Sequence, residues 1–191
     1  MVVDAAEAHR DDAPEVAVDC PGEIWFWGPI IMKEYWNKPK ATADAITADG
    51  WFRTGDIGRV DSEGNVYIMD RAKDLIIRGG ENISCAEVES AVYEYPEVAE
   101  CAVFGRKDDR LGETVAVAIT PVPTATRSSA AAAFEGLGNF LQSRLARFKI
   151  PDEVFVWEGQ LPRGATGKIP KKTIREMVDA GRAGTPEPHV R

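Results

Sequence analysis

The sequence predicts an α+β fold, in which a β-rich segment over residues 1–70 precedes a mixed segment over residues 71–185. Residues 23–67 contain short aromatic and β-branched runs separated by Gly, Pro, Asp and Asn, a pattern typical of strands and turns. Helical periodicity first appears after Ser84. A run of charges, Asp70-Arg71-Ala72-Lys73-Asp74, lies between the two patterns. We therefore expect a domain boundary at this run.

The β-rich segment begins with acidic, alanine-rich residues 1–22, for which we expect an irregular segment or a strand fragment. Four strands are then predicted, at residues 24–27, 51–54, 57–60 and 66–69. The last two are joined by Asp61-Ser62-Glu63-Gly64-Asn65, whose residues tolerate positive φ or bond their own backbone. This turn predicts a hairpin.

The mixed segment contains the best-defined helix of the chain, over residues 84–96. Its apolar residues Val88, Ala91, Val92 and Tyr95 fall on one helical face. Ser84 and Glu87 have the spacing of a capping box. Further elements are predicted as strands at 100–104, 114–120 and 154–157, helices at 130–148 and 171–180, and a disordered tail at 186–191.

Composition places the chain among ordinary globular proteins, with 44% hydrophobic and 28% charged residues in 191. The net charge of -8 argues against a nucleic-acid surface, which needs a basic face. No apolar run approaches membrane-spanning length, no signal peptide is visible, and a cytoplasmic location is expected. Three cysteines, Cys20, Cys85 and Cys101, show no metal-ligand spacing, so we expect reduced thiols and no metal site.

Positive charge gathers at one end of this acidic chain, between residues 163 and 175, where no acidic residue occurs. A local basic region of this kind suits a small anionic ligand better than a polymer. A solvated helix face is the alternative, and on charge alone it is the better interpretation.

Two short patterns in the first half of the chain have the residue types of ligand sites. Thr54-Gly55-Asp56 follows an aromatic strand, and its carboxylate could accept both hydroxyls of a ribose. The charged run at residues 70–74 could hold a hinge, because a few loop positions can absorb a domain reorientation. A structural turn and a solvated linker are the respective alternatives.

Two glycine-containing patterns follow. In Arg78-Gly79-Gly80-Glu81 the adjacent glycines permit unusual backbone angles or a close approach by a ligand, although on this pattern alone a tight turn is the better interpretation. Gly164-Ala165-Thr166-Gly167-Lys168 differs from a P-loop, because only two residues separate its glycines and Ile169 follows the lysine. Lys168 then remains as an ammonium that could neutralise charge developing between a carboxylate and a phosphorus atom.

Taken in order, these patterns resemble the adenylate-forming superfamily, which includes acyl-CoA synthetases, aryl-CoA ligases, luciferases and peptide-synthetase adenylation domains. The resemblance runs from Gly22-Glu23-Ile24-Trp25, through Gly28-Pro29, Tyr35-Trp36 and Pro39, to Ile174-Arg175-Glu176. It implies that residues 1–70 are the β-rich end of a large AMP-binding domain and that residues 71–185 are a small mobile C-terminal domain. The large domain and its phosphate loop are not in the chain, so the resemblance implies a fragment.

The resemblance also implies a role for each candidate residue. Asp56 and Arg71, with Thr54, would bind the nucleotide, and Lys73 would be the hinge. Arg78, Gly79 and Gly80 would line the path of coenzyme A. Lys168 would be the catalytic lysine of adenylation.

The implied reaction joins a carboxylic acid, expected to be a fatty acid, to CoA at the expense of ATP. Mg²⁺ would enter with ATP, although no metal ligand is identifiable in the sequence. The implied partners are the carboxylic acid, ATP, CoA and the missing N-terminal domain, supplied in cis or in trans. A carrier-protein-loading adenylation enzyme and a non-catalytic interaction module are the alternatives.

Overall fold

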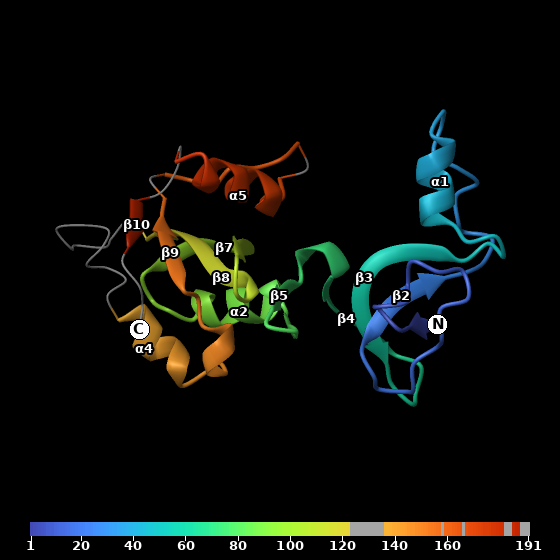
Figure 1. The fold of residues 1–191 in the computed structure, drawn as a ribbon, viewed down its shortest axis with the longest axis horizontal. Coiled ribbons are helices and arrows are strands. Elements are labelled where there is room, and N and C mark those ends of the chain that lie inside the picture. Colours follow the sequence, from blue (N-terminus) through green and yellow to red (C-terminus); the bar gives the residue numbers. More distant parts are fainter. Residues whose placement is uncertain (123–135, 158, 166, 182–184, 188–191) are drawn as a thin grey trace. The chain divides into compact units, whose positions relative to one another are not determined.

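The computed structural model describes residues 1–122, 136–157, 159–165, 167–181 and 185–187 (Figure 1). The chain divides into two compact units, Met1–Lys73 and Asp74–Arg191. Each unit has its own sheet and its own hydrophobic core. The mixed α+β class expected from the sequence is confirmed.

The first unit is a four-stranded antiparallel sheet in the order β1-β2-β3-β4. Its strands are β1 (Val2–Val3), β2 (Gly22–Phe26), β3 (Phe52–Val60) and β4 (Val66–Arg71). Trp25 is fully buried against Val3, Ala8 and Ala13. The irregular N-terminal segment therefore folds back over the sheet and supplies half of a small core.

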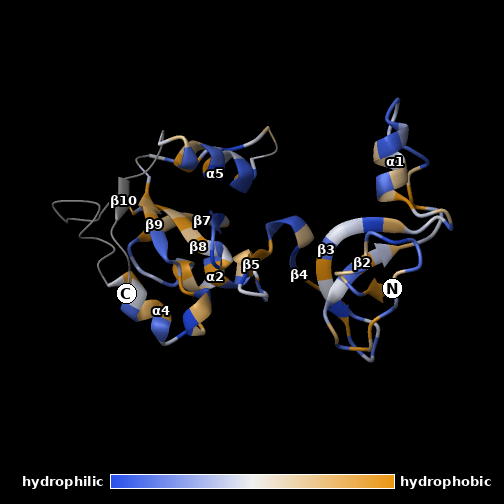
Figure 2. Ribbon diagram, in the orientation of Figure 1, coloured by the Kyte–Doolittle hydropathy of each residue, from blue (hydrophilic) through white to orange (hydrophobic). Residues whose placement is uncertain are grey.

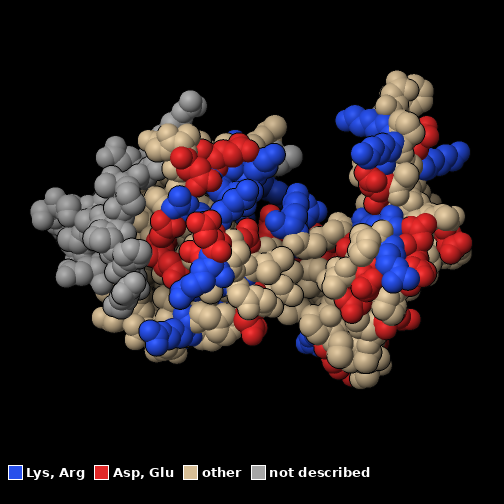
Figure 3. Space-filling model, viewed as in Figure 1, with Lys and Arg blue, Asp and Glu red and all other residues tan. Residues whose placement is uncertain are grey.

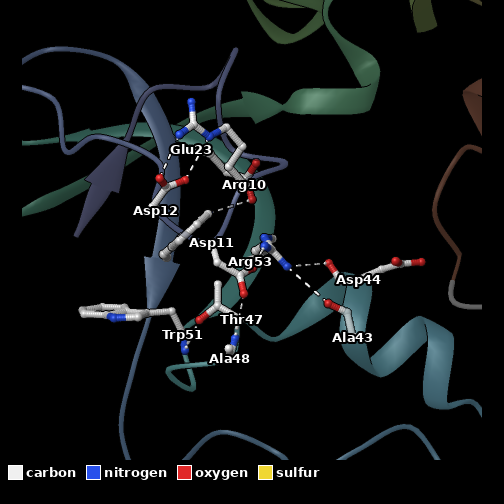
Figure 4. A network of polar contacts seen from close by, with 11 residues as sticks. Arg10, Asp11, Asp12, Glu23, Ala43, Asp44, Thr47, Ala48, Trp51 and Arg53 are labelled. Atoms are coloured by element: carbon white, nitrogen blue, oxygen red, sulfur yellow. Dashed lines mark hydrogen bonds and ion pairs between the residues drawn. The ribbon is translucent and has the colours of Figure 1, made fainter.

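Arg53 on β3 joins three parts of this unit (Figure 4). Its guanidinium donates to the carbonyls of Ala43 and Asp44, pairs with Asp11, and lies 5.3 Å from the ring centroid of Trp25. A cation next to the last carbonyls of a helix satisfies groups that have no partner within the helix. That helix, α1 (Pro39–Ala45), was not predicted. None of its residues is buried, so its sequence has no apolar stripe.

The two strands predicted at 51–54 and 57–60 are one strand, β3, which passes through Gly55. Gly55 has φ +69°, a backbone angle that glycine adopts without a steric penalty. The strand registers shift near this glycine, between Glu23 and Trp25 on β2 and between Ile57 and Gly58 on β3. Thr54-Gly55-Asp56 therefore lies within a distorted strand, and the alternative of a connecting turn is wrong.

The hairpin predicted at residues 60–66 is confirmed, with Val60 paired with Val66. Asp61 accepts hydrogen bonds from the backbone of Glu63 and Asn65, from the Asn65 side chain and from the Tyr67 hydroxyl. These bonds, led by the one from the Asn65 side chain, lower the pKa of Asp61 to about 2.

The hairpin should therefore weaken in acid. Because the folded-state pKa of Asp61 lies below its ordinary value of 3.8, its stabilising contribution is complete above pH 3.8 and is lost as the pH falls towards 2. An NMR titration of the Asp61 carboxyl should give a midpoint near 2, and Asn65→Ala should move that midpoint up towards 3.8. A midpoint unaffected by Asn65→Ala would contradict this assignment of the cause.

The second unit is a six-stranded sheet in the order β10-β9-β8-β5-β6, with β7 also paired with β8. Its strands are β5 (Ile76–Arg78), β6 (Glu81–Ile83), β7 (Val98–Asp108), β8 (Gly112–Pro121), β9 (Glu153–Val156) and β10 (Thr185–Glu187). Among the strand pairs of the described residues in this unit, only β8–β9 is parallel. Hydrophobic residues concentrate in β7, β8 and β9 (Figure 2). The strands predicted at 100–104, 114–120 and 154–157 are confirmed, and the first two are longer than expected.

Two cores pack on opposite faces of this sheet. Val115, Val117 and Ile119 of β8 belong to the core under α2 (Cys85–Tyr93) and α4 (Leu137–Gln142). Ala116 and Ala118 belong to the core under α5 (Lys171–Asp179). Successive side chains of a strand point to opposite faces, so β8 serves both cores.

The helix α2 confirms its sequence pattern. The hydroxyl of Ser84 accepts from the Glu87 backbone N–H, and Val88, Ala91 and Val92 are buried. The helix predicted over 130–148 is confirmed only in part. Residues 130–135 lie outside the described residues, α4 covers only Leu137–Gln142, and a 3₁₀ turn, η2 (Arg147–Lys149), follows an extended Ala146. Ala146, with φ -59° and ψ 145°, interrupts the helical backbone within the predicted range.

The tail differs from its prediction. Thr185–Glu187 form β10, which pairs antiparallel with β9, so Pro186 and Glu187 lie in a strand. The edge of β9 offers unpaired backbone groups, and pairing with them outweighs the lack of an apolar pattern. Residues 188–191 lie outside the described residues.

Candidate functional site

The distorted part of β3 presents Asp56 next to Arg71 of β4. The two residues are direct partners across the strands, and Arg71 Nε donates to Asp56 Oδ1 over 2.8 Å. The carboxylate is partly exposed and the guanidinium is more exposed. Since a carboxylate has four acceptor positions, the bond to Arg71 leaves enough for the two hydroxyls of a ribose.

Thr54 holds this arrangement from within the strand. Its hydroxyl donates to the Ile24 carbonyl at 2.6 Å and accepts from the Asp56 N–H at 3.0 Å. Because its single proton is bound to Ile24, Thr54 can offer a nucleotide only an acceptor. Its contacts position Asp56.

Glu23 was not among the predicted site residues, although it supports the same distorted part of β3. Its buried carboxylate accepts from the Gly55 N–H and from the Trp25 indole, each at 3.2 Å. A buried carboxylate is costly unless it is hydrogen-bonded, so a glutamate within an otherwise apolar strand was the available clue.

Lys73 lies in the 3₁₀ turn η1 (Ala72–Asp74), where the two compact units meet in the sequence. Its side chain is exposed. This position suits a hinge, and the hinge remains a prediction.

Gly79 and Gly80 form the two-residue turn between β5 and β6. Both have positive φ, of 58° and 90°, and their neighbours Arg78 and Glu81 are paired. Hairpin turns of two residues favour this geometry. A Cβ at Gly80 would meet no atom within 4 Å, so the backbone there is accessible to a ligand. Gly79 and Gly80 can therefore form the hairpin turn and still leave room for a ligand next to their backbone.

The side chain of Arg78 is engaged within the second unit. It donates to the Phe148 carbonyl and to Asp152 Oδ1, both at 2.8 Å, and is 16% exposed. These contacts fix the end of β5 to η2 and to the start of β9.

Lys168 is exposed at the end of the loop that precedes α5. Its carbonyl accepts from the Gly164 N–H at 2.8 Å, and Gly167, with φ +78°, donates to the Gly164 carbonyl at 2.9 Å. These bonds close a compact loop with the ammonium directed to solvent. Lys and Arg side chains gather around α5 (Figure 3).

The structure thus brings Thr54, Asp56 and Arg71 together in the first unit, whereas Arg78, Gly79, Gly80 and Lys168 belong to the second.

Within the described ranges, no group of three or more His, Cys, Asp or Glu side chains could hold a metal ion. Cys20, Cys85 and Cys101 are free thiols, and burial is the main cause that raises the pKa of Cys101 to about 12. No helix in the described part of the chain has the length and apolar character that crossing a membrane requires.

Comparison with known proteins identifies relatives for almost the whole chain. Residues 87–168 match the AMP-binding enzyme C-terminal domain. The chain is 44% identical to the long-chain-fatty-acid–CoA ligase FadD13 of Mycobacterium tuberculosis over 91% of its length, and 43% identical to an indoleacetate–CoA ligase of Aromatoleum aromaticum over 88%. It covers 33% and 32% of those two proteins, so it spans about a third of their length.

Solved structures give the same relationship. ATP-bound MatB from Rhodopseudomonas palustris superposes with a TM-score of 0.79 at 33% identity, over 95% of this chain and 34% of that one. The o-succinylbenzoate CoA synthetase MenE of Bacillus subtilis, in complex with its acyl-adenylate, gives a TM-score of 0.75 at 37% identity, over 91% and 33%. The chain belongs to the AMP-binding acyl-CoA ligase family and carries the C-terminal domain of that family.

Proposed function

We propose that this chain supplies the ribose-binding strands and the adenylating lysine of an ATP-dependent acid–thiol ligase. The observation that carries the proposal is the Asp56–Arg71 pair, in which adjacent strands present a carboxylate and a guanidinium held at 2.8 Å. The carboxylate accepts the ribose hydroxyls, and the guanidinium fixes its orientation and donates to the nucleotide.

The reaction has two steps. A carboxylate oxygen of the acid attacks the α-phosphorus of ATP, and pyrophosphate leaves with the electron pair of the broken P–O bond. The thiol of CoA, losing its proton, then attacks the acyl carbon, and AMP leaves. Mg²⁺ bound to the ATP phosphates would neutralise part of their charge.

Lys168 acts in the first step only. Its ammonium balances the negative charge that develops between the carboxylate oxygen and the phosphorus. Lys73 is the pivot on which the second unit changes pose between the steps, so that the Gly79-Gly80 turn borders the CoA path in the second. Such a motion presents different residues of one protein to two successive reactions.

The acid is proposed as a carboxylic acid in general, with a fatty acid as the first candidate. The relatives are named for different acids, among them long-chain fatty acids, indoleacetate, malonate and ferulate. The reactive group common to all four is the carboxylate.

The direct test is carboxylate-dependent exchange of pyrophosphate into ATP. It should be measured with this chain alone and with a hybrid ligase, in which this chain replaces the matching third of FadD13, its 44% identical relative. We expect exchange by the hybrid ligase only, since the chain spans a third of its relatives. A hybrid ligase that folds and binds ATP but catalyses no exchange would contradict the proposal.

Asp56→Asn should weaken AMP binding by the hybrid ligase roughly 10- to 100-fold, because a neutral amide replaces a charged acceptor of the ribose hydroxyls. Titration calorimetry measures the change. Asp49→Asn is the matched control, since it makes the same substitution at an exposed residue of the same unit. Equal weakening of AMP binding by both variants would show that Asp56 does not bind the nucleotide.

A non-catalytic interaction module is the second candidate, favoured by the exposed side chains of Trp27, Ile30 and Trp36. AMP-binding calorimetry distinguishes this candidate, because the isolated chain and the hybrid ligase would then gain no AMP affinity from Asp56. An enzyme that loads a carrier protein instead of CoA is distinguished by its thiol acceptor in the second step.

A further inference from the structure

The loop that carries Lys168 is anchored to the sheet at both of its ends. Leu161 is 2% exposed in the core under α5, and Ile169 packs against the same core. The described residues between them, from Pro162 to Lys168, are half-buried or exposed. Apolar packing therefore fixes the ends of this loop, and polar contacts must determine the path of the chain between them.

Arg163 supplies those polar contacts. One guanidinium nitrogen donates to the Gly167 carbonyl, next to Lys168, at 2.9 Å. Another pairs with Glu100. The second carboxylate oxygen of Glu100 accepts from the Leu161 N–H at 3.1 Å. One glutamate thus holds the start of the loop directly and its end through Arg163.

The position of Glu100 on β7 makes this possible. The register between β7 and β8 shifts between Val98 and Glu100, and such irregularities redirect the side chains beside them. Glu100 shares a face of β7 with Ala102 and Phe104, which lie in the core under α5. The carboxylate therefore belongs to the rigid sheet, whereas the residues that it binds belong to the loop.

We infer that Glu100 and Arg163 are positioning residues for Lys168: together they hold Leu161 and Gly167 in the positions that present the Lys168 ammonium to the reacting groups. This inference rests on the function proposed for Lys168. Arg163 is about half exposed, so its ion pair contributes little to global stability, and its effect is confined to the loop. The inference therefore predicts a change in local order without a change in global stability.

Hydrogen exchange of the 191-residue chain tests the loop without any need for catalysis. Arg163→Ala should speed exchange at the Gly164 and Gly167 amides, which donate within the loop, by about tenfold, because a hydrogen bond from a charged donor is lost. Glu100→Gln should have the same direction of effect. Exchange in β7 and β8, and the midpoint of thermal unfolding, should stay unchanged. Lys172→Ala removes a similar charge from an 81% exposed side chain and is the matched control.

A kinetic cycle in the hybrid ligase tests the coupling to Lys168. Arg163→Ala should lower pyrophosphate exchange about tenfold or more, and should cause no further loss when Lys168→Ala is already present. Thioester formation from preformed acyl-AMP should be spared, which a general folding defect would not allow. Arg163→Lys retains a positive charge near Glu100, but its ammonium cannot reach Glu100 and the Gly167 carbonyl together as the guanidinium does. This variant should therefore restore only part of the pyrophosphate exchange.

The possible failures are distinct. The positioning role would be overturned if Arg163→Ala left hydrogen exchange at the Gly164 and Gly167 amides unchanged. It would also be overturned if the losses of pyrophosphate-exchange activity caused by Arg163→Ala and Lys168→Ala were additive. Full pyrophosphate exchange by the Lys168→Ala hybrid ligase would instead overturn the proposed function of the lysine. In that case hydrogen exchange still decides whether Glu100 and Arg163 order the loop.

Discussion

Lys168→Ala in the hybrid ligase should lower pyrophosphate exchange by about 10²- to 10³-fold, the range found when one preorganised charge-stabilising donor is removed from an active site. The side chain is exposed and its loop is held by backbone bonds through Gly164 and Gly167, so the substitution removes the ammonium without disturbing the fold. Thioester formation from preformed acyl-AMP should change little, because the phosphorus–oxygen bond to be made already exists. Single-turnover measurements of the two steps provide the comparison.

Two further variants sharpen this result. Lys168→Arg keeps the charge but spreads it over a planar group, so exchange should recover only in part. Lys172→Ala, with an exposed side chain on the neighbouring helix α5, should leave both steps unchanged. Equal losses in the two steps for Lys168→Ala would exclude a role confined to adenylation.

Trp25→Ala should cost the first unit about 3–5 kcal/mol of unfolding free energy, as is usual for a large aromatic side chain removed from a core. Trp25 is 0% exposed and its indole donates to the buried carboxylate of Glu23. The substitution leaves a cavity, weakens a buried acceptor and removes the ring beneath Arg53. Hydrogen exchange should show the loss at the β2 and β3 amides.

The same experiment tests whether the two units are stabilised separately. Their cores share no residue among those described, so exchange in β7 and β8 should not change in Trp25→Ala. Trp27→Ala is the matched control, because this neighbouring ring is 66% exposed and its removal should alter stability by less than about 0.5 kcal/mol. Similar losses from the two substitutions would show that the ring of Trp25 is not a core anchor.

The parts of the fold that were predictable are those whose local pattern and tertiary role agree. The helix α2 has a capping serine and a single apolar face, and both appear in the structure. The strands β7, β8 and β9 are apolar and β-branched because they are buried between two layers. Periodicity and burial give the same answer for these elements.

The parts that were missed depend on contacts between distant residues. The helix α1 has no buried residue, and Arg53, from a later strand, binds its last carbonyls. The strand β3 continues through Gly55 because Glu23 holds the glycine N–H from the neighbouring strand. Neither arrangement leaves a periodic pattern in the segment itself.

The candidate site divides in the same way. Lys168 and Asp56 were identified because they stand in recognisable short patterns. Glu23 and Glu100 act on those patterns from other strands, and each occurs in the sequence as an isolated acid in an apolar run. Strand pairing brings Glu23 to Gly55, and the packing of the loop against the sheet brings Leu161 and Arg163 to Glu100.

The alternation along β8 has a consequence for how this domain can change. Its larger residues, Val115, Val117 and Ile119, face α2 and α4, whereas the alanines at 116 and 118 face α5. Deleting one residue within the strand would turn the residues beyond the deletion to the opposite face. Alanines would then face α2 and α4, and the larger branched side chains would face α5. Inserting or deleting an odd number of residues in β8 should therefore destabilise the domain unless a bulge restores the alternation, and natural length variation should concentrate in the connections beyond its ends. The core under α5, on the side of the Lys168 loop, and the core under α2 can therefore accept substitutions independently. A change in the register of β8 alters both cores at once.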